Sequence, residues 1–97
     1  MNSYRYRVTM EMTAGPKGEP VTGKSLSFET RNHDDILSIV ARLQARGDFA
    51  ADTTASLGVG LKLFSEVVLE NRNNPLFAPL REPLREFIGG LKKPRSQ

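Results

Sequence analysis

The chain of 97 residues contains no cysteine, no tryptophan and a single histidine, His33. Without cysteine the protein has no disulfide framework, no thiolate nucleophile and no thiolate metal ligand. With one histidine, a His/Cys metal cluster is excluded, and a Ser-His-Asp triad can be built only around His33. The sequence also has no glycine-rich phosphate loop, nucleophile motif or dinucleotide fingerprint. We therefore expect no metal, no other cofactor and no catalytic centre.

Long hydrophobic runs are absent as well. The longest apolar run is three residues, as at 67–69, which is far too short to span a bilayer. The first eight residues hold no apolar stretch of signal-peptide length, so we expect no secretory signal and a cytoplasmic protein. Hydrophobic residues make up 38% and charged residues 26%, which is typical of a soluble globular chain.

The net charge of +3 is concentrated at the C-terminus. Lys92, Lys93 and Arg95 lie in the last six residues, and without them the two signs are equal at eleven each. We expect one folded domain over residues 1–91 and a disordered basic tail over 92–97. A neutral body argues against a nucleic-acid binder, because such proteins usually carry a basic face on the folded part.

Two segments alternate with the period of a β-strand. Over residues 4–13 the apolar side chains fall on one face and the polar ones on the other, and a shorter alternation covers residues 25–31. The first apolar set is Tyr4, Tyr6, Val8, Met10 and Met12, and the second is Leu26, Phe28 and Thr30. Residues 14–23 between them hold three glycines and two prolines, so we predict a hairpin with a long loop and one buried face.

Three helical segments follow the hairpin. Asn32 can cap a first helix, with Asp34 and Asp35 at its positive end and Gly47 as its stop. Asp52 or Thr53 can cap a second helix that runs to about residue 72. Phe49, in the connector between these two helices, is expected to fill the core. The second helix contains two glycines, Gly58 and Gly60, each costing roughly 1 kcal/mol relative to alanine, and we expect close approach of another backbone to compensate.

Proline recurs at intervals of four in the last segment, at Pro75, Pro79 and Pro83. This spacing does not fit a polyproline II ligand, which repeats every three residues. Because proline favours the first turn of a helix, we predict a short turn near 75–80 and a third helix over about 82–90. Its buried side chains would be Leu84, Phe87, Ile88 and Leu91.

The predicted fold class is α+β, a hairpin of two antiparallel strands followed by three helices packed on one face, in the order ββααα. A lone two-stranded sheet is only marginally stable and exposes both edges. We therefore expect a symmetric homodimer, formed by edge-to-edge extension into a four-stranded sheet or by packing of the apolar helices.

Several strings in this order resemble a family of small bacterial proteins classed as a domain of unknown function. The strings are YRYRV at 4–8, LSFE at 26–29, NHDDI at 32–36, GLKLF at 60–64 and NRNNPLF at 71–77. The resemblance covers residues 4–91 and implies a bacterial protein with a single domain. It implies no activity and no catalytic residues.

Three polar clusters are candidate sites, and each has a simpler structural explanation. His33, Asp34 and Asp35 could bind a divalent metal or transfer protons, but capping of a helix start and compensation of its dipole explain them better. Arg5 and Arg7 could grip phosphates while the tyrosines stack on bases, yet the alternation places Tyr and Arg on opposite faces. The loop at 71–75 could recognise an anion, or its asparagines could simply form a turn.

The leading hypothesis is a non-enzymatic interaction or regulatory module that binds another protein, still unidentified. The alternative is a nucleic-acid-binding regulator that uses the Arg5/Arg7 strand face and the basic tail. The third is a small-molecule binder or enzyme centred on His33 and Asp34. The predicted interaction surface consists of Arg5, Arg7, Arg31, His33, Asp34, Arg72 and Asn73.

Overall fold

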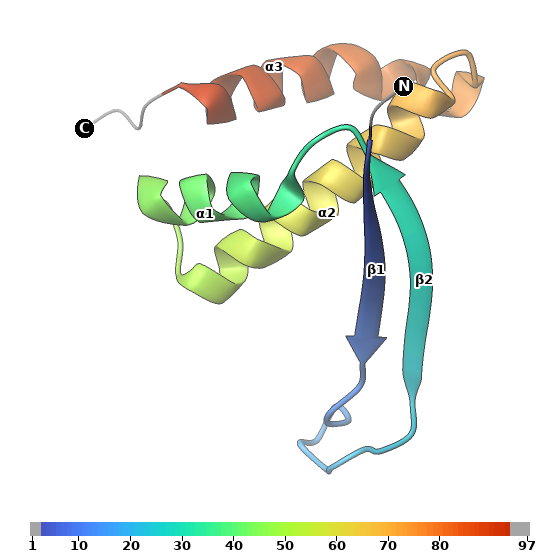
Figure 1. Ribbon diagram of the computed structural model, residues 1–97, viewed down its shortest axis with the longest axis vertical. Coiled ribbons are helices and arrows are strands. Elements are labelled where there is room, and N and C mark those ends of the chain that lie inside the picture. Colours follow the sequence, from blue (N-terminus) through green and yellow to red (C-terminus); the bar gives the residue numbers. More distant parts are fainter. Residues whose placement is uncertain (1–2, 94–97) are drawn as a thin grey trace. The chain divides into compact units, whose positions relative to one another are not determined.

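The computed structural model describes residues 3–93 and has the predicted α+β order, a two-stranded hairpin followed by three α-helices (Figure 1). The elements are β1 (Tyr4–Glu11), β2 (Ser25–Asn32), α1 (Ile36–Arg46), α2 (Ala51–Glu70), the 3-10 helix η1 (Pro75–Leu80) and α3 (Arg81–Lys92). The chain divides into two compact units between His33 and Asp34, the hairpin unit and the helical unit. Of the predicted basic tail over 92–97, residues 94–97 lie outside the described residues.

The hairpin places the two apolar sets on one face, as the alternation predicts. The two strands are antiparallel, and Val8 lies opposite Phe28 while Met10 lies opposite Leu26. The polar positions pair with one another on the other face, as Thr9 does with Ser27. Because side chains alternate along each strand, one face of the hairpin is apolar and the other is polar.

The apolar face of the hairpin is exposed at the end nearest the loop, where the sequence predicted burial. Met10 is 69% exposed, Leu26 59% and Phe28 41%. Two strands by themselves cannot cover one of their own faces, since a sheet buries a face only against another layer. The alternation thus reports which side chains share a face, and it does not report that the face is covered.

The helix α1 is capped by Asp35 before its first residue and by Gly47 after its last. The Asp35 side chain accepts a hydrogen bond of 3.1 Å from the backbone amide of Ser38, so Asp35 is the N-cap, in place of the predicted Asn32. Asn32 instead ends β2 and is fully buried. Gly47 has a φ of 82°, the left-handed conformation in which glycine commonly stops a helix, as predicted.

The helix α2 begins without the predicted side-chain cap. Its N-cap is Ala50, and the predicted caps, Asp52 and Thr53, lie inside its first turn. The buried Thr54 holds this end, because its hydroxyl donates to the carbonyls of Phe49 (3.3 Å) and Ala50 (3.0 Å). The Phe49 side chain is 54% exposed, so the prediction that it fills the core is wrong.

The last segment forms the predicted turn and helix. The Asn74 side chain accepts a hydrogen bond of 3.0 Å from Leu76 N and caps η1, which has proline at its start. The ring of Phe77 in η1 meets the ring of Phe64 in α2 edge to face, with centroids 6.4 Å apart. The helix α3 has no buried residue, and Phe87, predicted to be buried, is 47% exposed. Among the described helices, none is both long and apolar enough to cross a membrane.

The two glycines inside α2 differ in their surroundings. A Cβ atom at Gly58 would lie 3.0 Å from Cγ2 of Val40 and 3.4 Å from Cδ1 of Leu43, both on α1. The nearest atoms at Gly58 are thus side-chain atoms of α1, and the backbone of α1 comes to 3.8 Å at Val40 Cα, where α2 crosses α1. A Cβ atom at Gly60 would meet no atom within 4 Å, so the expectation of a close approach is wrong for Gly60.

This difference gives a matched pair of substitutions. Gly60→Ala should raise the free energy of unfolding by about 1 kcal/mol, because alanine favours the helix and nothing opposes its methyl group. Gly58→Ala has the same gain in helix propensity, but its methyl group must displace Val40 and Leu43. Its free energy of unfolding should therefore be lower than that of Gly60→Ala by roughly 1 kcal/mol or more. Urea denaturation followed by circular dichroism measures both, and equal stabilisation by the two substitutions would contradict the close approach at Gly58.

Candidate functional site

The polar face of the hairpin carries three of the predicted site residues. Arg7 is bound to Glu29 across the strands, with its Nη2 atom 3.1 Å and its Nε atom 3.3 Å from the same carboxylate oxygen. Next along the face, the hydroxyls of Thr9 and Ser27 share a hydrogen bond of 3.2 Å. Arg7 is therefore already partnered and does not stand as a free cation.

Arg5 and Arg31 lie directly opposite each other on the same polar face. Like charges at opposed positions of an antiparallel pair are destabilising. Neither guanidinium makes a hydrogen bond or ion pair within residues 3–93. This end of the hairpin therefore presents two adjacent cations that an external anion could neutralise.

His33 and Asp34 belong to different units. His33 follows β2 in the hairpin unit, while Asp34 opens the helical unit. The Asp34 carboxylate lies 2.5 Å from Nζ of Lys62 on α2 and joins the start of α1 to that helix. Across residues 3–93, no three His, Asp or Glu side chains gather in a way that could hold a metal ion.

Asp35 acts on α1 itself. Besides the Ser38 amide, it accepts a hydrogen bond of 2.8 Å from the Ser38 hydroxyl. The backbone hydrogen bond from Ser38, and after it the hydroxyl, hold the pKa of Asp35 below its ordinary value. The carboxylate of Asp35 is thus engaged in capping α1.

Arg72 and Asn73 lie in the exposed turn after α2. The backbone carbonyl of Arg72 accepts a hydrogen bond from the Arg81 guanidinium, which links the turn to the start of α3. The side-chain amide of Asn71 caps the end of α2, because its Nδ2 atom donates to the Val67 carbonyl at 2.8 Å. The contacts of this turn therefore stay within the helical unit.

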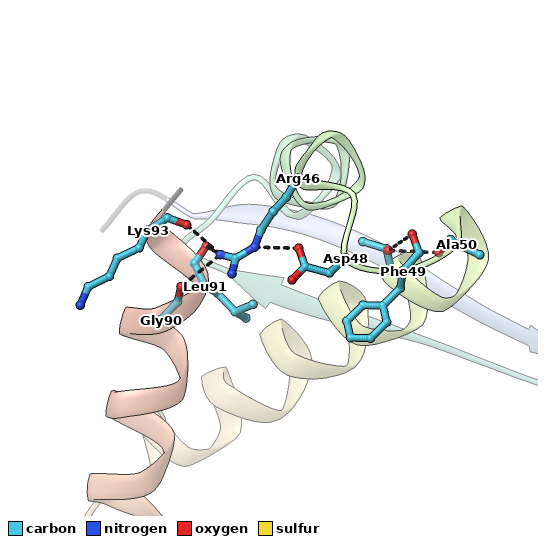
Figure 2. A network of polar contacts seen from close by, with 8 residues as sticks. Arg46, Asp48, Phe49, Ala50, Gly90, Leu91 and Lys93 are labelled. Carbon is cyan, nitrogen blue, oxygen red and sulfur yellow. Dashed lines mark hydrogen bonds and ion pairs between the residues drawn. The ribbon is translucent and has the colours of Figure 1, made fainter. Parts of the chain in front are cut away.

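A polar centre that the sequence did not indicate surrounds Arg46, the last residue of α1 (Figure 2). Its Nε atom lies 2.7 Å from Asp48 Oδ1, and its Nη1 atom donates to three backbone carbonyls at the end of α3. Those carbonyls are Gly90 (3.1 Å), Leu91 (3.0 Å) and Lys93 (2.8 Å). The carbonyls at a helix C-terminus lack partners within the helix, so one side chain satisfies several of them at once.

The only sequence signal for this centre was an arginine near the end of a predicted helix, which favours the helix dipole. That signal indicates an effect on α1 alone, and it does not indicate that Arg46 binds the end of α3. The arrangement has no nucleophile next to a base, and its chemistry is that of a structural tie between the ends of two helices.

The first prediction from this geometry concerns pH. A carboxyl group whose pKa is lowered in the folded state contributes stability above its unfolded pKa and loses it as the pH falls through the folded value. Asp35→Ala should therefore lower Tm by several degrees at neutral pH, and the deficit should shrink below about pH 4. Asp35→Asn keeps an acceptor without the charge, so its smaller deficit should not change with pH. A constant deficit for Asp35→Ala over pH 2–7, measured by circular dichroism, would contradict this role.

The second prediction concerns the Arg46 tie. Arg46→Ala leaves the carbonyls of α3 without their partner and should reduce the free energy of unfolding by about 2 kcal/mol. Arg42→Ala is the matched control, because Arg42 is an exposed arginine on the same helix with no partner among the described residues. It should change stability by less than about 0.5 kcal/mol. Backbone hydrogen exchange should also quicken at the end of α3 in Arg46→Ala alone.

Comparison with known proteins identifies the family. No functionally curated protein matches the chain. A crystal structure at 2.20 Å of a protein of unknown function from Pectobacterium atrosepticum SCRI1043 is similar, with 33% sequence identity and a TM-score of 0.80. The match covers 94% of this chain and 98% of that one. The family described as a domain of unknown function with a solved structure, DUF3861, matches residues 4–93. The chain therefore belongs to the DUF3861 family.

Proposed function

We propose that the protein is a non-enzymatic interaction module that works as a homodimer, with the hairpin as its pairing surface. The observation that carries the proposal is the apolar ladder formed by Val8, Met10, Leu26 and Phe28, in which Val8 is half-buried and the other three are exposed. Exposed apolar patches of this kind, rimmed by polar residues, are typical of protein interaction sites. The opposite face is lined by charged and hydroxyl side chains, so the hairpin has one face suited to a partner and one suited to water.

The strand edges support the same proposal. Within residues 3–93 the sheet has two strands, so neither strand is flanked by a further strand on its outer edge. Eight residues per strand make these edges long, and the apolar ladder would continue across a second hairpin placed beside the first. A second copy of this chain has the same strand edges and the same apolar face, and either surface can pair with its own copy, since a two-fold interface is self-complementary.

A nucleic acid is the second candidate partner, favoured by the opposed Arg5 and Arg31. Two unpartnered cations neutralise few phosphates and therefore give little affinity. Arg7, which the sequence offered as a third contact, is bound to Glu29. We rank this function below self-association for that reason.

Size-exclusion chromatography with light scattering tests the proposal, using untagged protein at low salt. We expect a mass of twice the 10.8-kDa monomer. The absorbance ratio at 260 and 280 nm is recorded in the same run, because a chain with no tryptophan and two tyrosines absorbs weakly and bound nucleic acid would stand out. A peak that carries nucleic acid at low salt and loses it at high salt would favour nucleic-acid binding over self-association.

Matched double substitutions locate the interface. Met10→Lys/Leu26→Lys places two opposed lysines on the apolar face, and Thr9→Lys/Ser27→Lys places two opposed lysines on the polar face of the same hairpin. Both add the same charge and the same cross-strand repulsion. We expect at least a tenfold weaker dimer for the first pair, equivalent to about 1.4 kcal/mol, and little change for the second. A monomeric wild type, or equal effects of the two pairs, would overturn the proposal.

A further inference from the structure

The helical unit holds a groove of about 380 Å³ that is independent of the hairpin. All three α-helices contribute apolar side chains to its lining. These are Ile39 and Leu43 from α1, Leu61 from α2, and Ile88 and Leu91 from α3. Gly58 adds a stretch of bare backbone at the crossing of α1 and α2.

Every other residue that lines this groove, within the described range 3–93, is a cation. These cations are Arg42, Arg46, Lys62, Lys92 and Lys93. Over the same range, no acidic residue and no uncharged polar residue lines the groove. An apolar pocket edged by five cations from three helices is electrostatically one-sided, so it favours a ligand with one apolar part and one anionic part.

The cations differ in whether the fold already uses them. Arg46 is occupied by Asp48 and by the carbonyls at the end of α3, and Lys62 by Asp34. Arg42, Lys92 and Lys93 make no side-chain hydrogen bond or ion pair within residues 3–93. Two charges thus hold the walls of the groove in place, and three remain available to an incoming anion.

We propose that this groove binds a single-chain amphiphilic anion, an aliphatic tail that ends in a carboxylate. The tail lies along the leucine and isoleucine side chains, where burial removes its methylenes from water. The carboxylate lies at the edge formed by Arg42, Lys92 and Lys93, whose donors it can accept.

The size of the groove favours a small molecule over a peptide helix. Its volume lies near the lower end of the range for small-ligand pockets, roughly 300–1,000 Å³. An amphipathic helix is about 10 Å wide and inserts anchors over two turns or more, which calls for a longer and wider groove. A cationic or neutral amphiphile gains nothing from the three free cations, so the sign of the head group is the property that identifies the ligand.

Isothermal titration calorimetry with three probes tests the proposal. Decanoate has the tail and the anion, decyltrimethylammonium has the same tail with the opposite charge, and acetate has the anion alone. We expect saturable binding of decanoate and no binding of the other two at roughly millimolar concentration. Decanoate binding should weaken in about 1 M NaCl, where the Debye length falls to roughly 3 Å.

A charge-matched pair of variants links the binding to the groove. Lys92→Gln/Lys93→Gln removes two free cations from the edge, and Lys17→Gln/Lys24→Gln removes two exposed cations from the hairpin loop. The first should weaken decanoate binding about three- to tenfold, and the second should leave it unchanged. Methyl resonances of Leu43, Leu61 and Ile88 should shift on titration with decanoate.

Three results would overturn the inference: no binding of decanoate, equal binding of decyltrimethylammonium, or methyl shifts confined to residues outside the groove. None of them bears on the proposed dimer, whose test uses no ligand and changes only the hairpin. The two proposals therefore fail separately.

Discussion

The chain buries few hydrophobic side chains, and this constraint decides which contacts hold the helices together. Among residues 3–93, the only large hydrophobic residues that are buried are Ile36 and Val68. Hydrophobic burial is normally the dominant favourable term in folding, so a thin core leaves the arrangement of the helices to other contacts. Those contacts include two polar ties, Lys62 against Asp34 and Arg46 against the end of α3. Directional bonds of this kind fix where two helices contact each other. They do not use the apolar side chains, which can therefore contact a ligand or a partner.

Local sequence patterns predicted the elements well, because the forces that define them act over a few residues. Alternation gave both strands and their shared face, since side chains of a strand point to opposite sides in turn. The proline spacing gave η1, since proline is tolerated in a first turn. The N-cap of α1 was misplaced by three residues, because asparagine and aspartate are nearly equal as caps and the string 32–35 offers both.

The polar ties could not be predicted, because each joins positions far apart in the chain. Nothing near Arg46 in the sequence indicates the carbonyls of α3, and nothing near Asp34 indicates Lys62. The exposure of individual side chains could not be predicted either. Phe49 and Phe87 have the character of core residues, yet their burial depends on what another element places over them. The groove and its ring of cations arise only when α1, α2 and α3 are brought together.

The opposed arginines of the hairpin bear on how its register is selected. A slip of two residues would keep both faces intact and would place Arg5 opposite Glu29, which removes the repulsion. The same slip would separate Arg7 from Glu29 and set Met10 against Lys24, so the apolar pairs and the existing ion pair hold the observed alignment. The hairpin is therefore electrostatically frustrated at its open end. Dissolved ions screen that repulsion, so moderate salt should tighten the pairing of the strands there while it weakens the surface ion pairs elsewhere in the molecule.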